Sequence, residues 1–296
     1  MSDGTGSWHS TAKKAFAGAK DFKDIVGVIW REGRDLFDYY QHYTTLSSVI
    51  TKIGERHWWL SRSDSERLND GQESQKFGVR RYYRRTYQTS FVYGSSESAA
   101  LWGMYAPGNP FALRITIPGN AIRNWVEELK HKSIHSKNNV DHPIDEVDFK
   151  DIIYAAVGFT DQNKTRLDRK RHNILHWSGE STSEIPDLEK EIKNDECSGW
   201  LKDYEWRHEN ESRLCVRIKK AIGAKSMWIP ISAELLESMS FTFSPWLDKS
   251  YESQVEDIIS TVYKRLLDKK DLNLSSKFHR SVLQGALRLS YGVHNV

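Results

Sequence analysis

The chain has 296 residues, of which 38% are hydrophobic and 28% are charged, and its net charge at pH 7 is +3. This length and apolar fraction predict a folded protein with a substantial core, and the mild charge neither requires nor excludes a nucleic-acid partner. Two cysteines, Cys197 and Cys215, exclude a disulfide framework. No apolar run is long enough to span a membrane, and the first residues lack the apolar stretch of a signal peptide, so we expect a cytoplasmic protein without a membrane partner.

The first part of the chain is expected to hold a flexible lead-in and a helical extension over residues 1–40, because apolar residues recur there at helical spacing. Gln41–Thr44 then reads as a short strand. Thr45 is a suitable cap for the following helix, and Gly54 is a natural stop. Trp58–Ser61 is predicted to be a second short strand.

The middle of the chain alternates between strand and helix signals. The predicted strands include 82–93, 111–117 and 152–157, and the predicted helices are 96–105 and 120–129. Residues from about 160 to 200 are highly charged and have few regularly spaced apolar positions, which is typical of an insertion or a helical flap.

The last third is predicted to contain strands at 214–218 and 240–243, followed by a helix with an apolar stripe from Val255 to Leu267. A second stripe predicts a C-terminal helix, packed on the core, within 271–296. Short strands mixed with helices, without regular βαβ alternation, predict the α+β class with one main domain over 41–270.

Two carboxylates, Glu209 and Glu211, stand two residues apart just before the apolar alternation of 214–218. In an extended strand, residues i and i+2 point to the same side, so we expect the two carboxylates to lie together. The alternative is a solvated strand edge in which Arg207 and Arg213 pair with the two glutamates, which would contribute about 0–1 kcal/mol to stability.

Several motifs in order resemble the bacterial domain-of-unknown-function family 2971 over roughly residues 40–262. The matching pieces are His42-Tyr43-Thr44-Thr45, Trp59-Leu60-Ser61 with Asn69-Asp70, Ser90-Phe91, Leu101-Trp102-x-x-Tyr105-Ala106 and Lys202-x-x-x-Trp206-x-x-Glu209-x-Glu211-x-Arg213. The loop near Asp70 departs from the family, which has Pro-Phe after Asn-Asp. The wider pattern resembles the ADP-ribosyltransferase-like fold, with its split mixed or antiparallel β core, including DarT-type and abortive-infection toxins.

This resemblance implies an enzyme that uses NAD as a substrate, with Glu211 as the catalytic carboxylate and Glu209 acting on the acceptor. It implies that His42 contacts a ribose hydroxyl or the nicotinamide amide, that Tyr43 or Tyr87 stacks on a ring, and that NAD is also held by Thr44, Ser61 and Ser90. The alternative for His42 is a strand histidine with a satisfied core hydrogen bond. The implied setting is phage defence or a toxin–antitoxin system with an antitoxin partner.

An arginine–tyrosine run carries Arg80, Arg81, Arg84 and Arg85. Arginines can contact phosphates while aromatic rings stack on unpaired bases, which favours an RNA or DNA acceptor. The same arginines could instead clamp the NAD pyrophosphate or form a solvated face. The same fold could also support NAD hydrolysis by water, or a non-catalytic module that binds nucleic acid or a protein partner. We expect no metal, since the histidine and cysteine spacing fits no zinc site.

Overall fold

The computed structural model describes residues 39–65, 83–137, 140–155, 157–159, 165–167, 199–268 and 274–286. The predicted N-terminal extension, Arg80, Arg81 and most of the charged insertion lie outside the described residues. The chain divides into two compact units. Unit 1 has its described residues within 60–91 and 130–228, and unit 2 has them within 38–59, 92–129 and 229–296. Three of the boundaries between the units fall inside strands, namely β2 (His57–Arg62), β3 (Thr86–Tyr93) and β12 (Ser226–Pro230).

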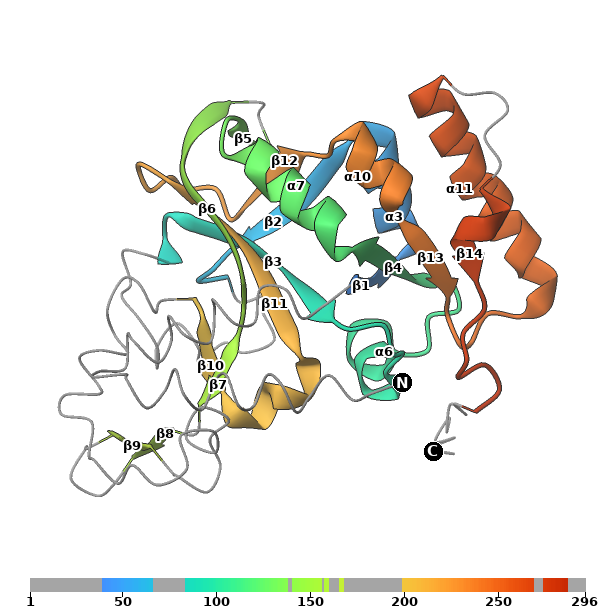
Figure 1. The fold of residues 1–296 in the computed structure, drawn as a ribbon, viewed down its shortest axis with the longest axis horizontal. Coiled ribbons are helices and arrows are strands. Elements are labelled where there is room, and N and C mark those ends of the chain that lie inside the picture. The colour runs from blue at the N-terminus through green and yellow to red at the C-terminus, as the bar shows by residue number, and fades with distance from the viewer. Residues whose placement is uncertain are drawn as a thin grey trace, which may run out of the picture. The chain divides into compact units, whose positions relative to one another are not determined.

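Unit 1 is built mainly from antiparallel strands. The long strand β6 (Asp141–Asp151) pairs with β11 (Glu211–Ile218) on one side and with β5 (Ser133–Ser136) on the other, and β5 pairs with β12. The strand order β11-β6-β5-β12-β2-β3, together with a pairing of β3 and β11, closes six strands into a ring. Figure 1 shows β6 running beside β11. This arrangement places the start of β11 next to β3.

Two small sheets complete the described part of unit 1. Strand β10 (Leu201–Asp203) pairs in parallel with β7 (Ile153–Ala155), and β8 (Val157–Phe159) pairs with β9 (Thr165–Leu167). The predicted strand over 152–157 corresponds to β7 and the first residue of β8, and residue 156 lies outside the described residues. A 3-10 helix, η2 (Tyr204–Glu209), leads from β10 toward β11.

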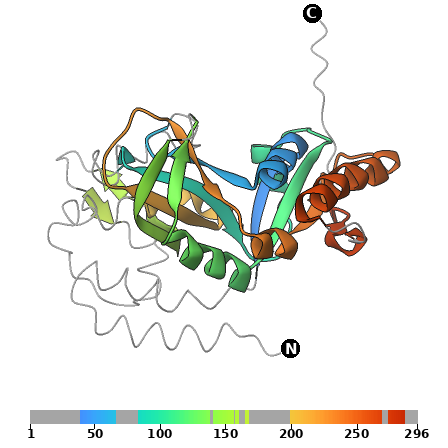
Figure 2. The same cartoon turned by 90° about the horizontal axis from the view of Figure 1, so that it is seen from above.

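Unit 2 contains the strands β1 (Tyr39–Thr45), β4 (Ala112–Pro118), β13 (Ser240–Phe243) and β14 (Phe278–His279). Strand β1 pairs antiparallel with β4 along its full length, β4 pairs with β13, and β13 pairs in parallel with β14. The helices are α3 (Leu46–Glu55), α6 (Ala99–Tyr105), α7 (Gly119–Leu129), α10 (Ala233–Ser238) and α11 (Glu252–Leu267), with short 3-10 helices η3 (Lys249–Tyr251) and η4 (Ser275–Lys277). Helices α3 and α11 pack together, as Figure 2 shows.

Helix α3 forms where its sequence predicts it. The side chain of Thr45 caps it by accepting a hydrogen bond from the Ser48 amide at 3.2 Å. Val49 and Ile53 are buried on one face. The helix ends one residue past the expected Gly54, because Arg56 adopts a left-handed conformation with φ 53° and its amide bonds back to the helix.

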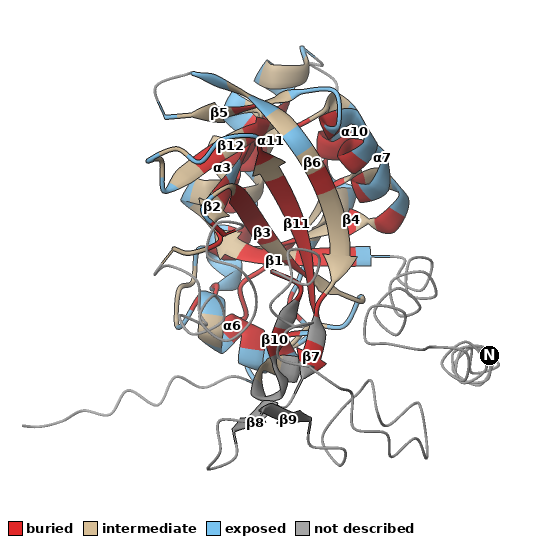
Figure 3. Cartoon of the chain, turned by 90° about the vertical axis from the view of Figure 1, so that its left-hand side faces the viewer, coloured by how far each residue is buried: buried red, intermediate tan, exposed pale blue. Residues whose placement is uncertain are grey.

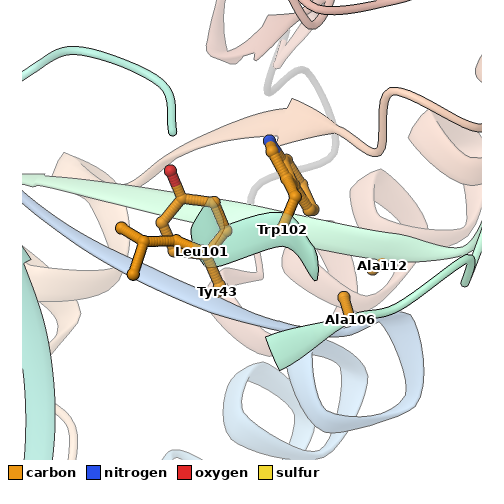
Figure 4. Packing of buried hydrophobic residues seen from close by; sticks show 5 residues of the cluster. All are labelled: Tyr43, Leu101, Trp102, Ala106 and Ala112. Carbon is orange, nitrogen blue, oxygen red and sulfur yellow. The ribbon is translucent and has the colours of Figure 1, made fainter. Parts of the chain in front are cut away.

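A hydrophobic cluster joins β1, α6 and the start of β4 in unit 2. Tyr43, Leu101, Trp102, Ala106 and Ala112 pack together, with the rings of Tyr43 and Trp102 edge to face at 4.9 Å (Figure 4). The cluster fixes β1 against α6. Among the described residues, no helix is both long and apolar enough to cross a membrane.

The structure confirms the α+β class and corrects one end of the chain. Residues 274–286 were predicted to belong to a C-terminal helix, but they form η4, β14 and a turn in which Gly285 has φ 78°. The apolar residue Phe278 packs on β13 by stacking with Phe241 and Phe243 instead of continuing a helical stripe. Residues 287–296 lie outside the described residues.

A candidate active site at a buried ion cluster

Glu211 is the first residue of β11, and its side chain is 3% exposed. One carboxylate oxygen accepts hydrogen bonds from the Ser90 hydroxyl of β3 and from Arg213 Nε at 2.6 Å. The other oxygen accepts from Lys202 Nζ and from Arg213 Nη2, both at 3.1 Å. A carboxylate has about four lone-pair positions, so these contacts fill its acceptor capacity. Figure 3 shows β3 and β11 buried along most of their length around this point.

Glu209 joins the same cluster through Lys202, whose Nζ lies 2.5 Å from Glu209 Oε2. The backbone between the two glutamates is not the continuous strand that we expected. Glu209 ends the 3-10 helix η2, and Asn210 adopts a left-handed conformation with φ 45° before β11 begins. The two carboxylates therefore lie together, as predicted, but through a tight junction and not through strand alternation.

The cluster is balanced in charge: two carboxylates, Glu209 and Glu211, face two cations, Lys202 and Arg213. Burial alone would raise the pKa of Glu211, but the nearby Arg213 and Lys202, with hydrogen bonds from Arg213 and Ser90, lower that pKa to about 2. Glu211 is thus ionised at neutral pH. All four side chains are almost fully buried, which corrects the alternative of a solvated edge.

The surroundings hold this cluster in place from several directions. The Glu211 amide donates to the Tyr154 hydroxyl at 2.7 Å, and the Glu211 carbonyl accepts from the Ile152 amide at 2.8 Å. Arg213 Nη1 donates to the Gly199 carbonyl at 2.9 Å, and Lys202 Nζ lies 4.8 Å from the ring centre of Trp206. These contacts fix the carboxylate position before any substrate binds.

A second carboxyl group, that of Asp151 in β6, lies next to the cluster, because Asp151 pairs with Ser212 of β11. It accepts a hydrogen bond from the Ser212 hydroxyl, yet burial raises its pKa to about 6. Asp151 therefore takes up a proton at a much higher pH than Glu211, although both are mainly ionised at pH 7. The sequence did not indicate Asp151 as a site residue.

In unit 2, the residues predicted to bind NAD near β1 have different environments. His42 is half-buried, and its ring meets Trp58 edge on at 5.0 Å. Tyr43 is 6% exposed within the cluster described above, and its hydroxyl accepts from the Ser98 amide at 3.2 Å. Burial raises the Tyr43 pKa. Little of the Tyr43 ring remains exposed for stacking, and Thr44 is half-buried in the pairing with β4.

In unit 1, Tyr87 is fully buried, and its hydroxyl donates to the Ala224 carbonyl at 2.9 Å. Burial raises its pKa to about 12. The ring has no exposed face, so the expected stacking on NAD does not fit this position. Ser61 pairs with Gln88 in the β2–β3 ladder, and Ser90 contacts Glu211.

Arg84 and Arg85 belong to a turn that precedes β3, and not to the strand predicted to begin at residue 82. Arg84 is exposed, and Arg85 Nη1 donates to the Lys219 carbonyl at 3.3 Å. The alternation that would split these arginines over two faces of a strand therefore does not apply to them.

Lys202 and Arg213 are the site residues to which sequence reasoning gave no catalytic or binding role. Both stand in the motif that carries the resemblance, and their positions relative to Glu211 were visible. What the sequence could not show is that η2 brings Lys202 between the two glutamates. Within the described ranges, no group of three or more His, Cys, Asp or Glu side chains is placed to hold a metal ion.

Comparisons with known proteins add little to this geometry. No protein-family model matches the chain, and no curated protein matches it. The resemblance to family 2971 is therefore unconfirmed. Among solved structures the chain is similar to Thermus sp. 2.9 DarT in complex with NAD+, with a TM-score of 0.35 and 10% identity, over 83% of this chain and 96% of that chain. A TM-score this low carries no argument about fold or activity.

Proposed function

We propose that this chain is an NAD-dependent ADP-ribosyltransferase that transfers ADP-ribose to a nucleic-acid acceptor and releases nicotinamide. The observation that supports it best is the buried, ionised Glu211 carboxylate, held by three partners and joined to Glu209 by Lys202. The resemblance in the sequence motifs adds the expected setting, a toxin in phage defence or in a toxin–antitoxin system, with an antitoxin as protein partner.

In the proposed reaction, the bond between ribose C1′ and the nicotinamide nitrogen breaks, and its electron pair leaves with nicotinamide. The transition state resembles an oxocarbenium ion, which a fixed carboxylate at Glu211 would stabilise by about 3–4 kcal/mol. Because the acceptor capacity of Glu211 is filled, a ribose hydroxyl must replace one partner, and the neutral Ser90 hydroxyl costs least to displace. An acceptor nucleophile then bonds to C1′ and loses its proton to Glu209.

Because Glu211 is buried in an ion cluster, a single substitution of this residue is a poor test of its role in catalysis. Glu211→Gln alone would leave two buried cations facing one carboxylate, and the resulting instability would obscure any loss of activity. We therefore choose two charge-balanced double variants. Lys202→Met/Glu211→Gln removes the proposed catalytic carboxylate, and Lys202→Met/Glu209→Gln retains it with its Arg213 and Ser90 contacts.

With labelled NAD and total cellular RNA, DNA and protein, the wild-type chain should release nicotinamide and label nucleic acid. The double variant at Glu211 should release none, whereas the one at Glu209 should still cleave NAD but label the acceptor weakly. Circular dichroism checks that both variants fold. Nicotinamide release by a folded Glu211 double variant would remove Glu211 from the mechanism, and label on polypeptide would mean a protein acceptor.

His42 is proposed separately as an NAD contact. His42→Ala should raise the dissociation constant for NAD in calorimetry, and an unchanged value would leave His42 as a structural neighbour of Trp58.

One observation favours a second candidate function, a non-catalytic nucleic-acid-binding module. The four hydrogen bonds to Glu211 and the charge balance of the cluster also fit a purely structural role. That candidate predicts nucleic-acid binding without nicotinamide release by the wild-type chain, so the same assay separates the two.

A further inference from the structure

The loop that joins β11 to β12 is strongly basic. Its sequence over residues 219–225 is Lys-Lys-Ala-Ile-Gly-Ala-Lys, with three lysines and no acidic residue. Lys219, Lys220 and Lys225 are all exposed. The site described above makes no use of these three positive charges. We call this segment the lysine loop (Figure 1, between β11 and β12).

Hydrogen bonds to the loop backbone hold the lysine loop in a defined position within unit 1. Arg62 Nη1 donates to the Ile222 and Ala224 carbonyls, both at 3.3 Å, and the Arg62 amide donates to the Lys225 carbonyl at 2.9 Å. The buried Tyr87 hydroxyl donates to the Ala224 carbonyl at 2.9 Å. The backbone that carries the lysines is thus largely ordered before any ligand binds, which lowers the entropy cost of binding.

The turn with Arg84 and Arg85 lies against the same loop. The Arg85 carbonyl accepts from the Ile218 amide at 3.0 Å, and Arg85 Nη1 donates to the Lys219 carbonyl at 3.3 Å. Arg85 therefore positions the loop, while the exposed Arg84 adds a second positive charge from the same turn. Together these residues form one basic surface, which we define as Arg84, Arg85, Lys219, Lys220 and Lys225.

In the part of the chain that the structure describes, three acidic residues close to this surface form ion pairs with arginines outside it. Asp64 forms an ion pair with Arg62 at 2.5 Å. Arg217, at the end of β11, pairs with both Asp145 and Glu146 of β6. Among the described residues, these pairs combine three carboxylates with two cations, a net charge of −1 beside the five cations of the basic surface, which therefore keeps a positive potential.

We propose that the basic surface binds the sugar–phosphate backbone of a polynucleotide, with Lys219 and Lys220 as its principal contacts. Lysine ammonium groups attract phosphates as point charges and read no base, so we expect the binding to be independent of sequence. The proposal rests on the proposed function for its biological meaning, since it assigns the surface that receives the acceptor. It extends the predicted arginine contacts to a loop that the sequence did not single out.

The test measures binding of the full chain to labelled single-stranded RNA, single-stranded DNA and duplex DNA by fluorescence anisotropy, without NAD. Lys219→Gln/Lys220→Gln removes two charges from the surface. Lys264→Gln/Arg265→Gln is the matched control, because it removes two charges from adjacent exposed residues of α11. The logarithm of the binding constant falls linearly with the logarithm of the salt concentration. Each lost contact to a single strand should make this negative slope shallower by about 0.7.

We expect the lysine-loop variant to bind about tenfold or more weakly at low salt, with a slope smaller by about 1.4, while the control binds like wild type. Equal weakening in both variants would show an effect of net charge alone and would overturn the proposal. Polyglutamate is the non-nucleic-acid polyanion, and if the wild-type chain bound it as tightly as RNA or DNA, the proposal would also be overturned. The relative affinities of RNA and DNA identify the source of the phosphates. If the wild-type chain binds nucleic acid at the loop yet releases no nicotinamide, the proposed enzyme fails and the binding surface stands.

Discussion

At the scale of single residues, the charge on Glu211 should govern stability in acid. Its pKa of about 2 lies below the ordinary value of 4.5, so its contribution to folding is fully present above pH 4.5 and is lost as the pH falls toward 2. Glu211→Gln should lower the free energy of unfolding at pH 7 by about 3–5 kcal/mol, because it leaves Lys202 and Arg213 with a single carboxylate. Urea titrations of both proteins from pH 7 to pH 2 would measure this.

The difference in free energy of unfolding between the wild-type protein and Glu211→Gln should decrease as the pH falls from 4.5 toward 2. Glu97→Gln is a suitable comparison, since Glu97 also accepts several hydrogen bonds, from Trp102, Ser281 and Val282, without belonging to the ion cluster. A Glu211→Gln protein as stable as wild type at pH 7 would show that the cluster contributes nothing to folding.

Lys52 is a second residue whose charge state the fold controls. Its side chain is 5% exposed, bonds to Ser48 Oγ at 2.6 Å and lies 5.1 Å from the ring centre of Trp58, and burial lowers its pKa to about 8. The unfolded chain holds this proton up to about pH 10.5. Stability should therefore rise with pH between 8 and 10.5, and the charge costs about 3 kcal/mol below pH 8.

Lys52→Met should consequently stabilise the protein at pH 7 by roughly 1–3 kcal/mol, since it removes the buried charge but loses the contacts to Ser48 and Trp58. The rise between pH 8 and 10.5 should disappear in this variant. Chemical denaturation at pH 7, 9 and 10.5 measures both effects, with the exposed Lys264→Met as control. A destabilised Lys52→Met would indicate that the ammonium is held favourably in the native state.

The pair of glutamates illustrates what the sequence could predict at this scale. Their identities and two-residue spacing indicated a shared position, and the structure brings both to Lys202. Their burial was not predictable, because it depends on β3 and β7, which come from distant parts of the sequence, and on the 3-10 helix η2 just before β11. The same holds for Tyr87, whose aromatic ring is equally compatible with a core or a binding surface until its neighbours are known.

At the scale of elements, the junction between η2 and β11 depends on Asn210. Its φ of 45° is tolerated by asparagine and glycine and costs other residues roughly 1–2 kcal/mol. Asn210→Gly should therefore be nearly neutral, whereas Asn210→Val should lower the free energy of unfolding by about 2 kcal/mol or more and displace Glu209 from Lys202.

Thermal unfolding measures the effect of these substitutions, and Asn124→Val, at an exposed helical position of α7, is the control for the change in side chain. If Asn210→Val and Asn124→Val cost the same, the junction is not strained.

Elements with strong local signals were predicted well. Helix α3 has an N-cap and an amphipathic face, β13 begins and ends at the predicted residues, and α11 follows its apolar stripe. Strand β6 was missed because its side chains are mostly exposed or half-buried, so its sequence shows no apolar alternation. The segment 274–286 was predicted wrongly because Phe278 and Val282 are four residues apart, as on one face of a helix, although Phe278 lies in a short strand that pairs with β13.

At the scale of the whole molecule, unit 2 depends on the last part of the chain. Strand β13 pairs with β4, and α11 packs on α3, so a chain ending at Ile231 would uncover both partners. We expect such a chain to aggregate, because the buried faces of β4 and α3 would meet water.

A chain ending at Asp268 is the matched comparison. It keeps β13 and α11 but loses β14 and the hydrogen bonds from Ser281 and Val282 to Glu97. It should remain soluble with a lower melting temperature. Sedimentation of both purified chains distinguishes the outcomes, and a soluble, folded chain ending at Ile231 would contradict the assigned role of β13 and α11.

The division of the chain within β2, β3 and β12 also determines when each unit can fold during synthesis on the ribosome. Unit 2 is assembled from three separate segments, the last of which begins at residue 229. Strand β1 leaves the ribosome roughly 200 residues before β13, a delay of about 10–40 s at ordinary elongation rates. During that interval α3 and β4 lack part of their packing, whereas the described segments of unit 1 are complete by residue 228. Codon choice or chaperone supply should therefore affect the fraction of chains in which unit 2 folds correctly more than the fraction in which unit 1 does.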